Sequence, residues 1–165
     1  MNLAEANLST YANRFSGYTE LRMQRNTNLS VVLLNGDVTS NTRATASGVS
    51  TRVFKDGVWG FASRPELDET SILSVIEDAT ANARFLAARA GQGALSLPSE
   101  RAQYNVDFGT SKPRRSRQQT IDFLRELDQY VTEHCPHLKS RTVQLADLDM
   151  EKNLFNSVGS RAYSN

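Results

Sequence analysis

The residues best suited to chemistry lie in one short segment, His134-Cys135-Pro136-His137. Imidazole nitrogen and thiolate sulfur are ligands that zinc prefers in proteins. The chain has no other histidine or cysteine to complete a ligand set. Pro136 also interrupts the helical spacing that would bring both rings to one face. We therefore interpret the segment as a helix terminus, where a histidine suits the helix dipole, and not as a metal site.

Three further groups could carry chemistry, and each has a simpler structural interpretation. Cys135 could act as a nucleophile only with a histidine held within hydrogen-bond reach, so a half-buried structural thiol is favoured. The basic run Lys112–Arg117 has no interleaved aromatic residues, which favours a solvated flank over a nucleic-acid contact. The carboxylates Asp147, Asp149 and Glu151 alternate along the chain, as on the exposed side of a strand.

The segment Gly48–Ser63 predicts a β-hairpin with its turn at Asp56-Gly57, because both positions of such a turn favour positive φ. Trp59 and Phe61 point to the same side of the second strand. Packing of these rings under a helix is the favoured interpretation, and an aromatic patch at a subunit contact is the alternative. Arg52 is either an edge charge or the partner of a carboxylate.

Composition sets broad bounds on the class of protein. The chain has 165 residues, 39% of them hydrophobic and 22% charged, which is typical of one ordinary soluble domain. A net charge of +1 gives no case for nucleic acid as a partner. The first residues show no signal peptide, no apolar run is long enough to span a bilayer, and the single cysteine favours a cytoplasmic setting.

Hydrophobic periodicity predicts an α+β fold, an antiparallel β-sheet meander with α-helices packed mainly on one face. The predicted helices cover residues 3–16, 68–90 and 116–135, the second stopped by Gly91 and the last opened by a capping box at Ser116 and Gln119. Each of the last two helices carries a predicted apolar stripe, Ile72, Val75, Ile76, Ala79, Ala83 and Leu86 on the second and Ile121, Leu124, Leu127 and Val131 on the third. The expected strands and turns are 18–24, 29–34, the Asn35-Gly36 turn, a polar strand from 38, the signature hairpin, 138–150, the turn at 156–159 and a last strand over 160–165. Residues 91–115 are expected to be mostly loop, with one extended piece at 104–108.

Several of these pieces resemble the amino-terminal domain of the TldD/PmbA family, the modulator of DNA gyrase proteins. The matching pieces are Tyr18–Arg22, Gly48-Val-Ser-Thr-Arg52, the Asp56–Ala62 turn and strand, the helix Leu67–Ala83, and Phe155–Gly159. The Gly48-Val-Ser-Thr-Arg52 and Gly60-Phe-Ala62 pieces look more like the TldD branch than the PmbA branch. The signature positions, each interpreted as structural, are Gly48, Arg52, Asp56, Gly57, Trp59, Gly60, Phe61, Asn156, Ser157 and Gly159.

The resemblance implies a zinc metallopeptidase family that hydrolyses unfolded or extended peptides. In its paired TldD–PmbA complex, only the TldD-type subunit carries zinc, on an HExxxH helix. No such helix can be found in this sequence, so we expect a single TldD/PmbA-like amino-terminal domain over residues 1–165 that ends before the catalytic part. It is expected to have no cofactor of its own.

Two interpretations of function remain open from the sequence. The first is a non-catalytic module that serves subunit assembly and forms part of the peptide channel, with a TldD/PmbA-type subunit or a second copy as its partner. The second is a stand-alone interaction module that binds through an exposed sheet edge. Because Ser160–Asn165 begins a strand with nowhere evident to continue, Leu138–Met150 would lie at or near a sheet edge. The sequence therefore also predicts that the chain self-associates or binds a family partner through its last strands. The coding region beyond Asn165 would distinguish the two interpretations.

We expect the purified chain to show no peptidase activity and to bind zinc no more tightly than about micromolar, because two histidines and one thiol on either side of a proline cannot build a zinc site. Metal analysis of untagged protein and a casein-cleavage assay with added zinc test this expectation. Stoichiometric zinc, or zinc-dependent cleavage, would contradict it.

Overall fold

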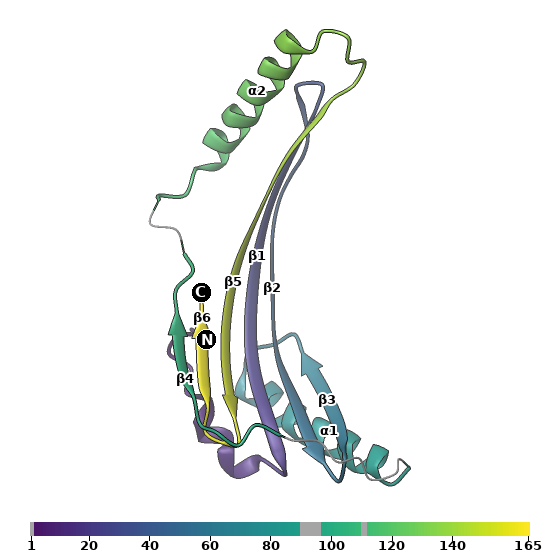
Figure 1. Ribbon diagram of the computed structural model, residues 1–165, viewed down its shortest axis with the longest axis vertical. Coiled ribbons are helices and arrows are strands. Elements are labelled where there is room, and N and C mark those ends of the chain that lie inside the picture. Colours follow the sequence, from purple (N-terminus) through teal and green to yellow (C-terminus); the bar gives the residue numbers. More distant parts are fainter. Residues whose placement is uncertain (1, 90–96, 110–111) are drawn as a thin grey trace. The chain divides into compact units, whose positions relative to one another are not determined.

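The computed structural model describes residues 2–89, 97–109 and 112–165. Within them, six strands form one sheet in the order β3-β2-β1-β5-β6-β4 (Figure 1). Strands β2 and β3 pair antiparallel, as do β5 and β6, whereas β4 runs parallel to β6. The predicted α+β class is therefore confirmed. The elements in chain order are η1 (Leu8–Arg14), β1 (Tyr18–Leu34), β2 (Asp37–Lys55), β3 (Val58–Arg64), α1 (Glu69–Ala87), β4 (Gln103–Val106), α2 (Arg117–His134), β5 (Thr142–Asn156) and β6 (Arg161–Ser164).

The contacts divide the chain into two compact units, which are described separately. The first unit comprises residues 1–25, 46–108 and 150–165, and the second comprises 26–45 and 109–149. Strands β1, β2 and β5 contribute residues to both. The strands are longer than the sequence predicts. The two expected strands over 18–24 and 29–34 are one continuous strand, because pairing with neighbouring strands outweighs the low β propensity of the polar residues between them.

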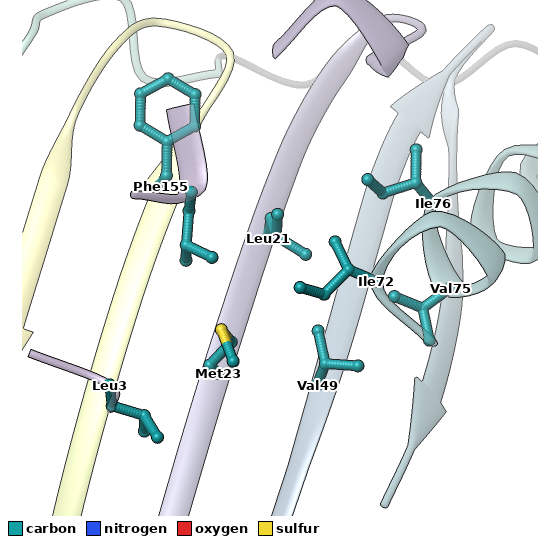
Figure 2. Packing of buried hydrophobic residues seen from close by; sticks show 9 residues of the cluster. Leu3, Leu21, Met23, Val49, Ile72, Val75, Ile76 and Phe155 are labelled. Carbon is teal, nitrogen blue, oxygen red and sulfur yellow. The ribbon is translucent and has the colours of Figure 1, made fainter. Parts of the chain in front are cut away.

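The core of the first unit begins with the alternation in β1. Thr19, Leu21 and Met23 are all fully buried, as the period-two pattern predicts. Figure 2 shows Ile72 of α1 directed at Val49 of β2, beside Leu21 and Met23. Leu3 and Leu8 close the same cluster from the amino-terminal segment. This segment is not the predicted amphipathic helix over 3–16. Only Leu8–Arg14 is helical, as a 3₁₀-helix, and Gly17, at φ +85°, turns the chain into β1.

Helix α1 packs against β3 at very short range. Gly60 of β3 is buried, and a Cβ built on it would lie 2.1 Å from the carbonyl oxygen of Ala79 and 2.4 Å from the nitrogen of Ala83. The small alanine side chains on the facing side of α1 permit this approach. Asp68 caps the helix, because its carboxylate accepts a hydrogen bond from the Ser71 amide at 2.7 Å.

The apolar stripe that the sequence predicts on α1 is confirmed at its centre and wrong at its end. Ile72, Val75, Ile76, Ala79 and Ala83 are buried, whereas Leu86 is 44% exposed. The expected helix end near residue 90 and the expected stop at Gly91 lie outside the described residues.

The second unit packs α2 against β1 and β5. The capping box at Ser116 and Gln119 is present as predicted, and the helix ends at His134, before Pro136. Leu124 is buried with Val31 and Leu33. The predicted stripe is wrong at Leu127, which is 39% exposed, because Asp128 takes the inward position beside it.

Asp128 is buried because it has a specific cationic partner. Its carboxylate accepts a hydrogen bond from Arg141 Nη2 at 2.8 Å and lies 2.7 Å from Arg141 Nε. Arg141 and Asn35 also exchange hydrogen bonds, from the Asn35 amide to the Arg141 carbonyl at 3.0 Å and from the Arg141 amide to Asn35 Oδ1 at 2.9 Å. This set of contacts joins α2, the Asn35-Gly36 turn and the start of β5.

The end of the chain differs from the expected open edge. Strand β6 lies between β5 and β4 (Figure 1), with Asn153 opposite Tyr163 on one side and Asn105 opposite Tyr163 on the other. The premise for self-association through residues 160–165 is therefore wrong. The prediction fails because β4, which comes from a region expected to be mostly loop, pairs with β6 and covers its edge.

We expect Gly60→Ala to lower the free energy of unfolding by about 1–3 kcal/mol, the cost of forcing extra volume into a packed interior. The added methyl group would meet backbone atoms of α1, which cannot rotate away as a side chain can. Chemical denaturation measures the change, with the exposed Ser63→Ala in the same strand as the matched control. Equal stability of the two variants would show that α1 does not lie against Gly60.

Candidate functional site

Aromatic and charged side chains gather in the first unit on the side of β1, β2 and β3 that faces away from α1. We call this the aromatic face and define it as Tyr18, Glu20, Arg52, Phe54, Trp59 and Phe61. The register of β2 and β3 brings Arg52 opposite Phe61 and Phe54 opposite Trp59. Because side chains alternate along a strand, these residues point away from the core, toward which Thr51 and Val53 point.

Trp59 is the centre of this face. Its ring meets Tyr18 edge-on with ring centroids 5.9 Å apart and lies 5.2 Å from the ring of Phe54. The guanidinium carbon of Arg52 lies 4.6 Å from the centroid of the Trp59 ring, which is cation–π geometry. Three strands thus hold the indole in a fixed position with its neighbours.

Glu20 links the charged part of the face. It accepts two hydrogen bonds from Arg52, from Nε at 2.5 Å and from Nη2 at 2.9 Å, and a third from the Tyr18 hydroxyl at 2.9 Å. Such a two-pronged contact is strong and fixes the plane of the guanidinium group. From the sequence, Arg52 was either an edge charge or the partner of a carboxylate. The structure shows the second, because Arg52 pairs with Glu20.

The pKa values follow from this arrangement. The hydrogen bond to Glu20 raises the pKa of Arg52 above its usual value, although burial opposes the change. Burial, and then the hydrogen bond to the Glu20 carboxylate, raise the pKa of the Tyr18 hydroxyl. Both groups therefore keep their protons throughout the neutral range, and the face keeps a fixed pattern of donors and acceptors.

The structure corrects the favoured interpretation of Trp59 and Phe61 as packing under a helix. The residue of β3 that lies under α1 is Gly60, so its neighbours on either side point away from the helix. Phe61 is 60% exposed, and Trp59 is half-buried by the rings around it. The aromatic patch, given as the alternative from the sequence, is what the structure contains.

The remaining signature positions are turn residues and one glycine of β2. Asp56 and Gly57 have φ of +50° and +86°, as the predicted hairpin turn requires. Gly48 lies close to β3, since a Cβ there would be 2.7 Å from the carbonyl oxygen of Arg64. Asn156 is buried and accepts hydrogen bonds from the amides of Val158 and Ser160 at 3.1 and 2.9 Å.

Ser157 fastens this second turn to the start of β1. Its amide donates to the Thr19 carbonyl at 2.9 Å, and its hydroxyl accepts from the Thr19 amide at 3.1 Å. Gly159 completes the turn at φ +89°. Tyr18 is thereby held next to the turn, where Asn156 Nδ2 donates to its hydroxyl at 3.4 Å.

The histidine–cysteine segment lies apart, in the second unit. The ring of His134 stacks on Tyr130 at 4.0 Å, and its Nδ1 lies 2.9 Å from the Tyr130 carbonyl oxygen. Cys135 is exposed at the end of α2, so the predicted half-buried position is wrong. In the described part of the chain, no three His, Cys, Asp or Glu side chains come together in a way that could hold a metal ion.

The three alternating carboxylates have cationic partners. Arg114, from the basic run, lies 3.9 Å from Asp147 and 2.9 Å from Asp149. Glu151 belongs to the first unit, where it lies 3.5 Å from Arg25 and accepts from the Tyr163 hydroxyl at 3.0 Å. Its side chain is only 19% exposed, so the expectation of an exposed strand side is wrong for Glu151.

The aromatic face does not follow from the sequence alone, although Arg52, Trp59 and Phe61 stand out there as candidates. Glu20 and Phe54 do not stand out in the sequence as members, and Tyr18 stands out only as the start of a strand. The available signal was the period-two alternation of a strand, which places Tyr18 and Glu20 together on the side opposite Thr19. The alternation within one strand does not predict the register between strands, which brings Phe54 next to Trp59.

We expect Glu20→Gln to lower the pKa of Tyr18 toward its ordinary value of 10.0. The carboxylate raises this pKa because it accepts the hydroxyl proton and repels the phenolate, and a neutral amide with Arg52 still nearby removes that effect. The stability linked to the raised pKa is present below pH 10 and is lost as the pH rises through the folded-state value, so the variant should lose less stability at high pH. Carbon-13 NMR titration of the tyrosines, with the Tyr18 signal assigned from the Tyr18→Phe variant, measures this pKa. An unchanged pKa of Tyr18 in the Glu20→Gln variant would refute the Glu20 contact.

None of the described helices is long and apolar enough to cross a membrane. A search of curated proteins found no match to the chain. A family model described as PmbA/TldA metallopeptidase domain 1 matches residues 19–83.

Solved structures with the same fold include TldE from Thermococcus kodakarensis, at 17% identity and a TM-score of 0.67, covering 95% of this chain and 35% of that one. They also include a putative modulator of a DNA gyrase from Thermotoga maritima, at 18% identity and a TM-score of 0.61, covering 89% of this chain and 33% of that one. A putative modulator of DNA gyrase from Bacteroides thetaiotaomicron has 19% identity and a TM-score of 0.61, covering 93% of this chain and 36% of that one.

At these identities the structural likeness shows the fold, and the chain spans about a third of the length of each solved structure. The model match covers β1 to α1, the segment that carries most of the signature positions and all residues of the aromatic face except Tyr18. By the matched segment and by its fold, the chain thus resembles the first domain of the TldD/PmbA metallopeptidases, as its sequence predicts.

Proposed function

We propose that this chain is the non-catalytic amino-terminal module of a TldD/PmbA-type metallopeptidase that acts on extended peptides. Its work is subunit assembly and the formation of part of the peptide channel, in the cytoplasm. The partner is a TldD/PmbA-type subunit or a second copy. Zinc belongs to the catalytic part of the full-length TldD-type protein and not to this chain.

The aromatic face is the observation that carries the proposal. Tryptophan, tyrosine and arginine are the residues that contribute most often to binding energy at protein interfaces. Here all three lie on one side of three paired strands, held by contacts that leave little freedom to lose on binding. Phe61 extends this face with a ring that is 60% exposed, and so provides apolar area for a partner to cover.

The matched family is named for peptide hydrolysis, and its model describes this segment as the first domain. A first domain that presents a rigid face, and whose described residues form no cluster of metal ligands, suits a structural role beside a catalytic part. An extended peptide next to this face would meet aromatic rings and the fixed Arg52–Glu20 pair, which provide apolar contact and hydrogen bonding.

The alternative, binding through an exposed sheet edge, has less support at β3. That strand lies at one edge of the sheet, where unpaired backbone groups can accept another strand. The carbonyl oxygen of Phe61 already accepts a hydrogen bond from Asn82 Nδ2 of α1 at 2.9 Å. The helix therefore closes this edge at its middle, which favours the face over the edge as the binding surface.

We expect Phe61→Ala to weaken binding to a TldD-type subunit by about tenfold or more, which is typical of an aromatic residue that a partner covers. The matched control is Phe85→Ala, which removes an equally exposed ring, 58% against 60%, from α1. Co-purification and isothermal titration calorimetry with the TldD-type protein encoded in the same genome measure the effect. Sedimentation of the chain alone tests pairing between copies.

Two outcomes would contradict the proposal. One is binding that neither variant changes, which would exclude the aromatic face from the interface. The other is an equal loss in both variants, which would show a general effect of removing exposed rings. Retained circular dichroism in both variants is the check that the fold is intact.

A further inference from the structure

The second unit contains an open cavity of about 430 Å³ that is rich in arginine. Arg43 of β2 lines it, together with Arg114 and Arg115 from the segment before α2. Leu29 and Leu145 provide apolar lining, and Asp147 is the one acidic residue in the lining. We call this cavity the arginine pocket. None of its residues belongs to the aromatic face.

The charge in the arginine pocket is not balanced within the described chain. Arg114 is ion-paired with Asp147 and Asp149. The guanidinium of Arg115 lies 4.1 Å from the centroid of the Phe123 ring, a contact that leaves its charge unneutralised. Arg43 is exposed and has no ion-pair partner among the described residues. Two guanidinium groups at one cavity are thus free to bind an anion.

The apolar part of the lining restricts which anion fits. Leu145 packs against the buried cluster of Val31, Leu33 and Leu124, so it is held in place. Leu29 lines the same cavity from β1. A ligand that fills the pocket therefore combines a negative group with an apolar group a few ångströms away. An isolated inorganic anion would leave the leucine surface uncovered.

We propose that the arginine pocket binds an acidic peptide segment in which a glutamate or aspartate stands next to a large apolar residue. Arg43 and Arg115 hold the carboxylate, because the planar fork of a guanidinium group matches its two oxygens. The apolar side chain covers Leu29 and Leu145. Asp147, which also lines the pocket, disfavours a ligand with negative charge along its whole length, such as a nucleic acid.

This inference goes beyond the proposed function, since it concerns other residues and a different ligand. The pocket would bind the acidic segment whether or not the aromatic face docks a subunit. The two proposals therefore fail separately: loss of acidic-peptide binding leaves the effect of Phe61→Ala untouched, and the reverse also holds.

The test is fluorescence anisotropy with the whole chain and a fluorescein-labelled peptide that alternates glutamate and leucine. We expect Arg43→Ala and Arg115→Ala each to weaken binding by about tenfold, the usual loss for one charge-assisted contact. Arg125→Ala removes an exposed arginine of α2 that does not line the pocket, and it should leave the affinity unchanged. Arg43 is exposed on its strand, so its variant is expected to fold normally.

Three ligand controls complete the experiment. A peptide with glutamine in place of glutamate should lose binding, and one with serine in place of leucine should bind more weakly. Inorganic phosphate and a single-stranded oligonucleotide should compete only at much higher concentration. Equal losses in the Arg125→Ala and Arg43→Ala variants, undiminished binding of the glutamine peptide, or stronger binding of the oligonucleotide would each overturn the proposal.

Discussion

The close approach of α1 to β3 is the contact on which the first unit depends. Gly60 has no room for a side chain, since a Cβ there would lie 2.1 Å from the Ala79 carbonyl oxygen. Once Gly60 is fixed under the helix, the alternation of a β-strand leaves no choice for its neighbours. Trp59 and Phe61 must point away from α1, and the residues opposite them on β2 must do the same. One small residue thus decides which side of the strands is core and which side is available for binding.

The available side is organised rather than merely exposed. Arg52 makes two hydrogen bonds to Glu20 and also covers the ring of Trp59, so one guanidinium group orders both the charged and the aromatic part of the face. Since the pair is partly exposed, its contribution to stability is small, on the order of 1 kcal/mol. Its value lies in preorganisation, because side chains that are already fixed lose little entropy when a partner binds.

The second unit is ordered by a different interaction, an ion pair between the buried Asp128 and the partly buried Arg141. Asp128 and Arg141 join the helix, the β1–β2 turn and the start of β5 through contacts of 2.7–3.0 Å. Breaking such a pair from one side leaves a buried charge without a partner, which is why it specifies one arrangement of these elements. The same unit contains the arginine pocket, where by contrast the cationic charge of Arg43 and Arg115 is left unbalanced.

The sequence by itself determined the local elements of this protein and the family that it resembles. The capping box at Ser116, the Asp56-Gly57 turn and the stripe from Ile72 to Ala83 are short-range patterns, so backbone preference and periodicity suffice to predict them. Tertiary structure alone decided three things. The two predicted strands over 18–24 and 29–34 form one continuous strand, Asp128 rather than Leu127 faces inward, and β4 covers the edge of β6. Each depends on a partner far away in the chain, such as Arg141 for Asp128 or Ala79 for Gly60, and sequence spacing does not encode which distant residues will meet.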